Sequence, residues 1–417
     1  MTASWILGGL ACLSFVLLLW QWLVARRFPL HRRVSDESFT PGVTLLKPLK
    51  GMDETTADNL RSWLAQDYAG EVQVLFGVAS ASDPVCEIVR DLLREFPGRD
   101  AQLVVCSESK GVNPKVSKLI ELQRLAKHDI IVVSDADVRA PPDLLTNLVA
   151  LLMPRSCACN GDLTPHGSFE HHKKDGSPAL KSAGVAAAEA ARFNPGLVTC
   201  LYQLANPKTH AMRWEAVAVN VDFWSQVLQA QSIARLDFAL GAVMAVRRDA
   251  LESIGGFSAF ANCLADDYQL GHRLVRAGWR IELCPVVVEC WSEPLGWRAV
   301  WRHQLRWART IRACKPLPYL SSILSNPTLW PLLWVLARPT AFIAAIAGTF
   351  LVTRLFIAHD LMRRLSRVRP GAWLFWAVPL KDLLQVGVWA LAFVGHTVEW
   401  RGQRYRLGSG GEMTRSG

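Results

Sequence analysis

The N-terminal segment from Trp5 to Val24, WILGGLACLSFVLLLWQWLV, is the feature that most restricts how this chain can fold. The segment carries no charge, and as a helix it reaches about 30 Å, the thickness of the hydrocarbon core of a bilayer. It has no basic leader and no small-residue cleavage site, which disfavours a removable signal peptide. A basic cluster follows directly: Arg26, Arg27, His31, Arg32 and Arg33. The positive-inside rule therefore predicts an N-terminus outside the cell and a cytoplasmic position for the chain that follows.

Two more apolar stretches lie near the C-terminus. Residues 329–358 are interrupted by an Arg-Pro pair and by a further arginine, and they form either one long tilted span or two closely joined spans. Residues 373–398 contain Lys381 and Asp382, adjacent opposite charges that we expect to neutralise each other in part. Both stretches are long enough for membrane helices, and together they predict a multi-pass protein.

The number of C-terminal crossings stays open. Basic clusters at residues 363–369 and 401–406 both favour the cytoplasm. An interfacial or re-entrant position of residues 373–380 would reconcile the two clusters. The Gly-Ser tail after Leu407 is predicted to be disordered.

Composition supports a membrane protein rather than a nucleic-acid-binding protein. The chain of 417 residues is 51% hydrophobic, and its formal net charge is +10. Its basic residues gather beside apolar segments instead of forming one stripe, so we expect no nucleic-acid partner. Ten cysteines occur without a C-x-x-C pair, which favours reduced thiols in a cytosol-facing domain.

Between residues 43 and 291 the pattern changes to alternating strands and helices. The expected strands cover residues 43–51, 72–80, 101–106, 130–133, 196–202 and 241–248. The expected helices cover residues 59–66, 83–96, 115–126, 215–229 and 264–279, with Asp83 as an N-cap. This alternation predicts an α/β domain with a mostly parallel sheet and helices on both faces. Residues 155–181 are rich in Gly, Ser, Pro and His and lack apolar periodicity, so they are interpreted as a polar insertion or loop. Their three histidines favour a solvated loop over a metal site, because no acidic or cysteine partner has metal-ligand spacing.

The stretch DIIVVSDADVRAPP, residues 129–142, places Asp135 and Asp137 directly after a buried strand. Ligands of open α/β sheets bind beyond the carboxyl ends of such strands. Two carboxylates at that edge can hold a hard divalent cation, which in turn can hold phosphates. Chance produces roughly one D-x-D triplet in a chain with this aspartate content, so the position after the strand is what makes the pair notable.

A second acidic pair, Asp266 and Asp267, begins a helix in LADDYQLGHRLVRAGW. Helix capping explains one carboxylate at a helix N-terminus, and the other remains available for acid–base chemistry. Further on, residues 297–314 read WRAVWRHQLRWARTIRAC, a basic helix with indoles that suits a cytoplasmic membrane interface. No P-loop and no G-x-G-x-x-G after a strand are present.

These features together suit a nucleotide-sugar transferase, whose diphosphate leaving group needs cationic stabilisation. The motifs VTLLKPLKG, SASDP, GVNPKVSKL, SDADV, FALGAVMAVRR, LADDYQLG and RHQLRWARTIR extend over most of residues 40–315. In these motifs the chain resembles the ceramide glucosyltransferases (family 21), a group that is similar to family 2 and includes bacterial hopanoid-associated glycosyltransferases. The resemblance implies a GT-A fold, Mg²⁺ or Mn²⁺ as cofactor, a UDP-sugar donor and a membrane lipid acceptor.

The resemblance also implies roles for individual residues. It assigns nucleotide contacts to Asp83, Lys47 and Lys115, and the metal and diphosphate to Asp135 and Asp137. It assigns the general base to Asp267, with Asp266 as its acidic neighbour. The last motif, Q/R-x-x-R-W, falls on Arg306 and Trp307, but its first position is His303 instead of Gln or Arg. Whether a neighbour, Arg302 or Gln304, supplies the missing contact stays open at this point.

The leading hypothesis is an inverting transfer of glucose from UDP-glucose to a ceramide-like hydroxyl. The alternatives are N-acetylglucosamine transfer to a hopanoid, a processive polysaccharide synthase and a non-catalytic membrane scaffold. The expected parts are an anchor (1–34), a cytosolic domain (35–296), an interfacial Arg/Trp helix (297–316), a membrane region (317–400) and a basic, partly disordered tail (401–417). The bacterial relatives suggest an inner membrane.

Overall fold

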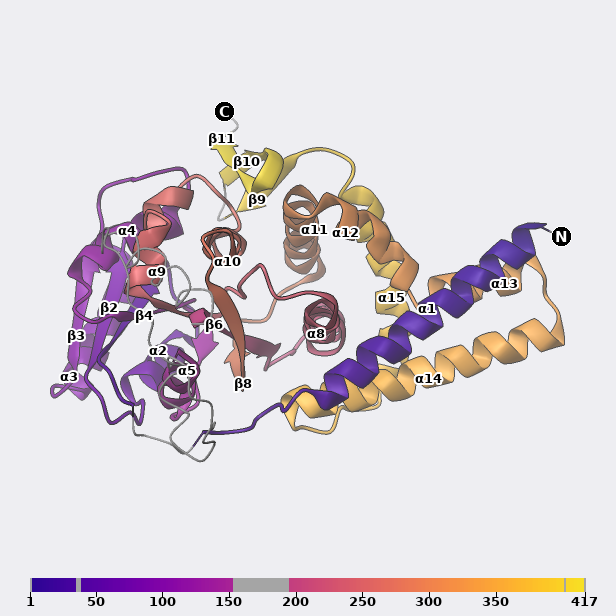
Figure 1. The fold of residues 1–417 in the computed structure, drawn as a ribbon, viewed down its shortest axis with the longest axis horizontal. Coiled ribbons are helices and arrows are strands. Elements are labelled where there is room, and N and C mark those ends of the chain that lie inside the picture. Colours follow the sequence, from indigo (N-terminus) through magenta and orange to yellow (C-terminus); the bar gives the residue numbers. More distant parts are fainter. Residues whose placement is uncertain (1, 35–38, 153–194, 401–402, 416–417) are drawn as a thin grey trace, which may run out of the picture.

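The computed structural model describes residues 2–34, 39–152, 195–400 and 403–415. The insertion predicted at 155–181 lies outside these ranges. A sheet with helices on both sides makes up one end of the molecule, and a group of long helices extends away from it (Figure 1). The predicted division into an α/β part and apolar helices at both chain ends is therefore confirmed.

The main sheet has the strand order β3-β2-β1-β4-β7-β6-β8-β5. Its strands are β1 (Val43–Pro48), β2 (Val72–Val78), β3 (Asp100–Val105), β4 (Ile130–Ser134), β5 (Val138–Arg139), β6 (Pro195–Leu204), β7 (Val243–Arg247) and β8 (Arg280–Cys290). The first four strands in this order are parallel, as is the pair β6–β8. Strand β7 runs antiparallel to both β4 and β6, a reversal that the strand–helix alternation did not predict.

Alternate strand residues bury opposite faces of the sheet. Leu45 and Val132 pack with α2 (Thr56–Leu64), α3 (Val85–Glu95) and α5 (Leu144–Leu152). Leu46 and Val133 face the other way, toward helices that come from several parts of the chain. These helices are α4 (Pro114–Leu125), α7 (His210–Val217), the π-helix η2 (Ala218–Phe223), α8 (Trp224–Ile233), α9 (Arg248–Ser253) and α10 (Asp266–Arg276). A short 3₁₀ turn, η3 (Phe257–Phe260), also packs on this face.

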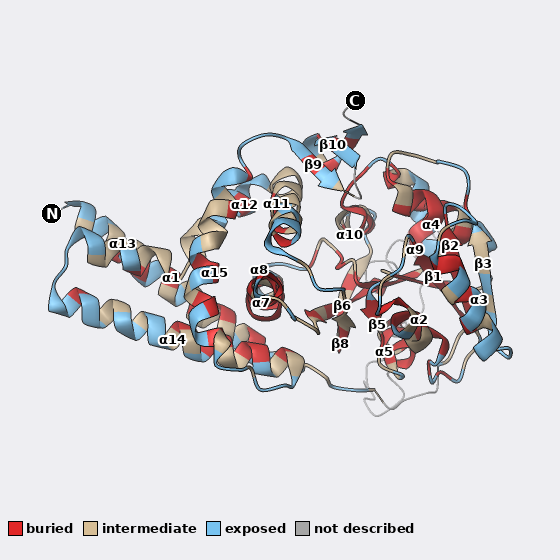
Figure 2. Cartoon of the chain, turned by 180° about the vertical axis from the view of Figure 1, so that it is seen from behind, coloured by how far each residue is buried: buried red, intermediate tan, exposed pale blue. Residues whose placement is uncertain are grey.

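The second of these faces continues into the apolar helices without a break. Its core includes residues of α1 (Thr2–Arg27) and α14 (Ala341–Ser366). Burial concentrates near the sheet, while the distant parts of these helices are largely exposed (Figure 2). Such exposed apolar helices suit lipid contact.

Helices α1 and α14 run parallel. Phe15 stacks on Phe350 with ring centroids 4.1 Å apart, and further along the indole of Trp22 donates to Asp360 at 2.7 Å. Helix α13 (Leu329–Ala337) lies near the start of α1, where Trp334 contacts Gly8. The chain therefore returns along α13 before α14 repeats the direction of α1.

Three helices among the described residues are long and apolar enough to cross a membrane: α1, α14 and α15 (Trp373–Leu391). A fourth crossing is available if residues 316–337 count as one broken span. This segment consists of α12 (Pro316–Ser321), the 3₁₀ turn η4 (Ser322–Ser325) and α13, bent by 54°. The Arg-Pro interruption noted in the sequence separates α13 from α14.

Helix α15 contacts α7 near its start and α12 near its end. Near its start, the Trp376 ring lies 5.8 Å from that of His210 on α7. Near its end, the indole of Trp389 donates to the Tyr319 carbonyl on α12 at 3.1 Å. Just beyond it, the Val394 carbonyl accepts a hydrogen bond from Arg309 on α11 (Trp297–Cys314) at 2.8 Å.

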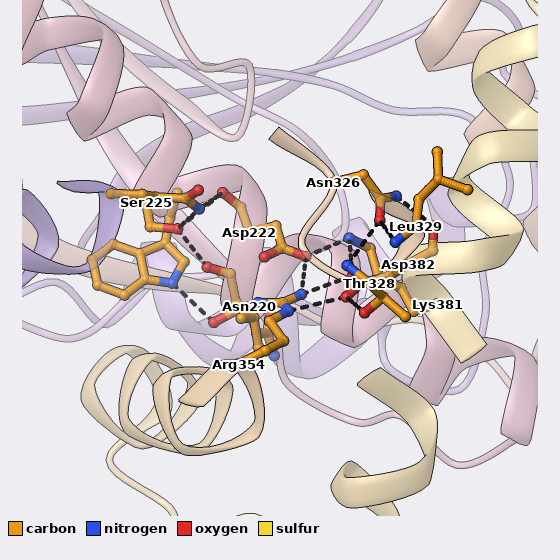
Figure 3. Close-up of polar contacts among 12 residues, drawn as sticks. Asn220, Asp222, Ser225, Asn326, Thr328, Leu329, Arg354, Lys381 and Asp382 are labelled. Atoms are coloured by element: carbon orange, nitrogen blue, oxygen red, sulfur yellow. Dashed lines mark hydrogen bonds and ion pairs between the residues drawn. The ribbon is translucent and has the colours of Figure 1, made fainter. Parts of the chain in front are cut away.

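A buried ion network joins α14, α15 and the π-helix η2 (Figure 3). It consists of Asp222, Arg354, Lys381 and Asp382. Arg354 Nη2 lies 3.0 Å from Asp222 and 2.9 Å from Asp382, and Lys381 pairs closely with Asp222. The Lys381–Asp382 contact expected from the sequence exists at 3.4 Å, but each side chain has a nearer partner on another helix.

The C-terminal residues form a small antiparallel sheet of β9 (Thr397–Trp400), β10 (Gln403–Leu407) and β11 (Met413–Arg415), with a turn at η5 (Ser409–Gly411). The prediction of a disordered tail after Leu407 is therefore wrong for residues up to 415. Leu407 and Met413 pack with Leu264, and the Leu264 amide donates to the Gly411 carbonyl at 2.9 Å. These contacts involve residues far apart in the chain, so the composition of the tail alone could not predict them.

Candidate active site

The carboxyl end of β4 carries the D-x-D pair. The Lys47 ammonium, fully buried, donates to Ser134 Oγ at 3.2 Å and to the Asp135 carbonyl, which fixes the backbone at this edge. The Asp137 carbonyl accepts from the Trp291 amide at 2.9 Å, while its carboxylate remains exposed. The backbone of both aspartates is therefore fixed by hydrogen bonds, from Lys47 at Asp135 and from Trp291 at Asp137.

Lys115 connects this edge to the second acidic pair. The Asn113 side chain caps α4 by accepting from the Lys115 amide at 2.9 Å, which sets the first turn of the helix. The Lys115 ammonium then lies 2.8 Å from Asp135 Oδ1 and 2.8 Å from Asp266 Oδ2. One buried lysine thus joins acidic groups that are more than a hundred residues apart.

Two glycines allow α10 to carry Asp267 into the same region. A Cβ on Gly271 would lie 2.5 Å from the Ala239 amide nitrogen, so α10 approaches this loop only because residue 271 lacks a side chain. A Cβ on Gly241 would lie 2.9 Å from Asp267 Oδ2. Asp267 Oδ1 accepts from the Tyr268 amide at 2.7 Å, which leaves its other oxygen on the Gly241 side.

We call the resulting group of charges the site cluster. Its members are Lys47, Lys115, Asp135, Asp137, Asp266 and Asp267. Burial, followed by the Asp266 carboxylate, raises the pKa of Asp267 to about 6. A carboxyl group with such a pKa is a stronger base than an ordinary aspartate and is still ionised near neutral pH.

The surrounding protein and the Asp135 carboxylate raise the pKa of Asp137 to about 6 as well. The Asp137 residue is nevertheless exposed, so solvent can reach it. Burial lowers the pKa of Lys47 to about 7, although Asp135 and Asp137 act in the opposite direction. Burial also disfavours charge on Lys115, but Asp135 and Asp266 more than offset this and raise its pKa.

Asp83 lies at the carboxyl end of β2, next to that of β1. Its carboxylate accepts from the Gly51 amide at 3.0 Å and from the Val85 amide at 3.1 Å. Gly51 has φ of +66°, a conformation that favours glycine. Asp83 therefore ties the loop after β1 to the start of α3, at the same edge of the sheet as Asp135.

Helix α11 carries the last predicted motif. His303 Nδ1 lies 2.7 Å from Glu215 Oε1, and its ring centroid lies 4.4 Å from that of Trp307. Arg306 is half-buried one turn after His303. The arginines at 302, 309 and 312 contact the segment from Val394 to Glu399.

Three residues near the site were not predicted from the sequence: Tyr202, Glu215 and Gly241. Burial raises the pKa of Tyr202 well above its ordinary value, with further contributions from Cys290, Asp267, Glu215 and Asp137. The phenol therefore lies near several acidic groups of the site. The available sequence signal was Glu215, the one acidic residue in the mostly apolar stretch MRWEAVAVNV.

The carboxylates suit a divalent cation that is shared with a phosphate ligand. No group of three or more His, Cys, Asp or Glu side chains arranged for a metal ion occurs in the described ranges. Mg²⁺ commonly takes only one or two protein carboxylates and completes its shell with water and substrate phosphates. Asp137, open to solvent and repelled by Asp135, fits that mode of binding.

Comparison with known proteins agrees with this geometry. The model of Glycosyl transferase family 21 matches residues 6–159 and 186–413. Ceramide glucosyltransferase 3 of Caenorhabditis elegans is 24% identical over 61% of this chain and 47% of its own length. A ceramide glucosyltransferase of Candida albicans is 35% identical over 28% of this chain and 24% of its own. The chain thus spans about half or less of the length of these curated relatives.

Among solved structures, a mannosyltransferase from Pyrobaculum calidifontis in complex with GDP-Man and Mn²⁺ has a TM-score of 0.51. It is 20% identical, and the match covers 92% of this chain and 99% of that one. At this identity the likeness establishes the fold, a GT-A glycosyltransferase fold. With a family model that matches most of its length, the chain belongs to glycosyl transferase family 21.

Proposed function

We propose that this glycosyltransferase moves glucose from UDP-glucose to the hydroxyl of a ceramide-like lipid, with inversion at the sugar carbon. The observation that carries the proposal is the site cluster itself, in which two carboxylates stay open, Asp137 at the sheet edge and Asp267 on α10. The cluster belongs to a domain whose core continues into apolar helices, which suits a lipid acceptor.

In the proposed reaction, Asp83 and Lys47 belong to the nucleotide end of the site, while Lys115 keeps Asp135 and Asp266 in place. Asp137, supported by Asp135, would hold Mg²⁺ or Mn²⁺, which when bound neutralises charge on the diphosphate. Arg306 and Trp307 act at the leaving group from α11.

Asp267 accepts the proton of the lipid hydroxyl as its oxygen attacks the anomeric carbon. The bond between that carbon and the diphosphate oxygen breaks from the opposite side, and UDP leaves with the bonding electron pair. Because Asp267 is ionised above a pKa of about 6, it can serve as the base at neutral pH.

The proposal includes a membrane topology. The C-terminal segment that forms the small sheet bonds to Leu264, just before α10, and to Gln269 within α10, through the Gly411 and Gly410 carbonyls. It therefore lies on the same side of the bilayer as the catalytic domain. The chain must then cross an even number of times between the domain and that sheet. Since α1 and α14 run parallel, we infer that the bent segment 316–337 and α14 are those two crossings.

Helix α15 then lies at the membrane interface, against α7 and α12. The basic flank after α1 favours the cytoplasm for the catalytic domain. Tags accessible to a membrane-impermeant reagent at the N-terminus but not at the C-terminus, in sealed cells, would support this arrangement. Equal labelling of both ends would exclude it.

The test of the reaction is transfer by purified full-length protein in lipid nanodiscs that contain either ceramide or a hopanoid. We expect radiolabel from UDP-glucose in a lipid product with ceramide. A product only from UDP-N-acetylglucosamine and the hopanoid would select the rival transferase. Absence of any lipid product and of UDP-sugar hydrolysis with all donors would favour a non-catalytic scaffold.

A further inference from the structure

The buried carboxylate of Glu215 forms hydrogen bonds with helix α11 at the predicted Q/R-x-x-R-W motif. Glu215, 4% exposed, accepts at Oε1 from His303 Nδ1 at 2.7 Å and from Gln304 Nε2 at 2.9 Å. Burying a carboxylate is costly unless it is paired and hydrogen-bonded. Here both partners belong to the segment that is expected to meet the leaving diphosphate.

The imidazole of His303 is held on two sides. Besides the Glu215 contact, the Trp307 ring lies 4.4 Å away at an interplanar angle of 59°. Trp307 in turn lies 6.4 Å from Phe223, and Phe223 lies 5.6 Å from Tyr202. With Nδ1 engaged by Glu215, the ring can offer Nε2 to a ligand.

Ring contacts connect the pair to Tyr202 on β6, next to the site cluster. Asp137, whose pKa is raised by burial and Asp135, is also influenced by His303, which acts to lower that pKa. Glu215 and Asp137 both act on the Tyr202 phenol. Tyr202 pairs with Val288 in the β6–β8 ladder, three residues before Trp291, whose amide donates to the Asp137 carbonyl. The ring contacts of His303 and Trp307 therefore lead to the end of β8 that holds Asp137.

We propose that Glu215 is a positioning residue that holds the His303 imidazole toward the leaving diphosphate, so that the Glu215–His303 pair replaces the Gln or Arg of the family pattern. This inference rests on the proposed transfer from a UDP-sugar. The Gln and Arg side chains are long and carry several hydrogen-bond donors. The His side chain is shorter and has only two ring nitrogens, one of which Glu215 engages. A second anchor is therefore needed to aim it.

The experiment measures transfer and donor KM for wild type, Glu215→Gln, His303→Gln and the double variant. Arg302→Gln is the matched control, because Arg302 is the exposed neighbour that pairs with Glu399 at 3.1 Å. We expect Glu215→Gln to lower kcat by about tenfold to a hundredfold with donor KM changed little, as for a misplaced catalytic contact. Arg302→Gln should match wild type.

The decisive comparison is the double variant. If Glu215 acts through His303, adding Glu215→Gln to His303→Gln should change kcat by less than about twofold. An equal loss in both backgrounds, or wild-type kcat in Glu215→Gln, would overturn the proposal. If Glu215→Gln does not fold, Glu215→Asp keeps the charge but withdraws the anchor, and it should lower kcat while UDP binding persists. Unchanged kcat in that variant would also overturn it.

These outcomes are separable from failure of the proposed function. A wild-type protein without any UDP-sugar transfer rejects the function itself. An active wild type with an unaffected Glu215→Gln variant rejects only the positioning role.

Discussion

The site cluster and the buried ion network are both groups of charges within the folded chain, but they differ in balance. The network sets Arg354 and Lys381 against Asp222 and Asp382, so its formal charges cancel. The site cluster sets two lysines against four aspartates, and burial weakens the charge of one of those lysines, Lys47. A balanced buried group is complete by itself, whereas an excess of carboxylates is stabilised by a cation from outside.

The two groups also differ in the solvent exposure of their side chains. Arg354 and Asp382 are each 1% exposed, and Thr328 adds a further hydrogen bond to Asp382 at 2.7 Å. Asp137 in contrast is exposed, and Asp267 is only half-buried. We therefore assign a structural role to the network and a ligand-binding role to the site cluster. The following predictions test that distinction, from the largest expected effect to the smallest.

Asp267→Asn should lower lipid transfer by about 10²- to 10⁴-fold, because it removes the proposed general base. UDP affinity, measured by calorimetry, should change by no more than a few-fold. Near-wild-type turnover would show that Asp267 is not the base. The same substitution should leave the thermal unfolding temperature close to wild type, since Asp267 is not part of a balanced group.

Arg354→Met should lower stability and leave catalysis intact, the reverse of the effect expected for Asp267→Asn. It leaves the Asp222 and Asp382 carboxylates opposite a single lysine, an imbalance that costs about 3–5 kcal/mol of unfolding free energy. Thermal unfolding in detergent should fall sharply, while activity per folded molecule is retained.

The matched variant is Arg354→Met combined with Asp382→Asn. It keeps the Asp222–Lys381 pair and restores neutrality, so we expect recovery of much of the lost stability. No recovery would mean that packing of the guanidinium, and not charge balance, holds α14 and α15 to η2.

Asp137→Asn should lower turnover by about a hundredfold, equivalent to about 2.7 kcal/mol of transition-state stabilisation, and should raise the Mn²⁺ concentration needed for half-maximal rate. Chelation of wild type should abolish activity, with restoration by Mn²⁺ or Mg²⁺. Asp129→Asn, at the exposed opposite end of β4, is the control and should behave as wild type. Activity that survives chelation would contradict the metal assignment.

The pH dependence should follow the ionised form of Asp267. Its pKa of about 6 lies above the ordinary value, so the base is lost as pH falls through 6 and the rate is level above about 7. Well below pH 6, kcat should fall about tenfold per pH unit. The groups that act on Asp267 are Asp266, Lys115 and Asp135, and substitution of Lys115 should move the midpoint upward.

Gly241→Ala should have the smallest effect. The new methyl group would meet Asp267 Oδ2 at 2.9 Å and displace it, so kcat should fall several-fold with little change in stability. Gly98→Ala is the control, because no atom lies within 4 Å of its added Cβ. If Gly241→Ala has the kcat of wild type, the position of Asp267 Oδ2 does not limit the rate.

Sequence reasoning predicted the elements whose signal is local. The apolar run after Trp5, the β-branched strand before Asp135 and the amphipathic helix after Asp266 all carry their period or composition within a few residues. The antiparallel direction of β7 and the C-terminal sheet were not predicted, since strand direction and tail docking depend on distant partners.

The sequence by itself determined the α/β class, the apolar helices and the identity of the acidic residues at the sheet edge, because these follow from patterning and from motifs at fixed spacing. Only the tertiary structure decided which charges meet. Lys115 joins Asp135 to Asp266, Arg354 joins Asp222 to Asp382, and Glu215 receives His303. Such contacts form when chain folding brings buried opposite charges within reach, since burial without a partner is too costly. The spacing of these residues along the chain therefore does not predict the contacts.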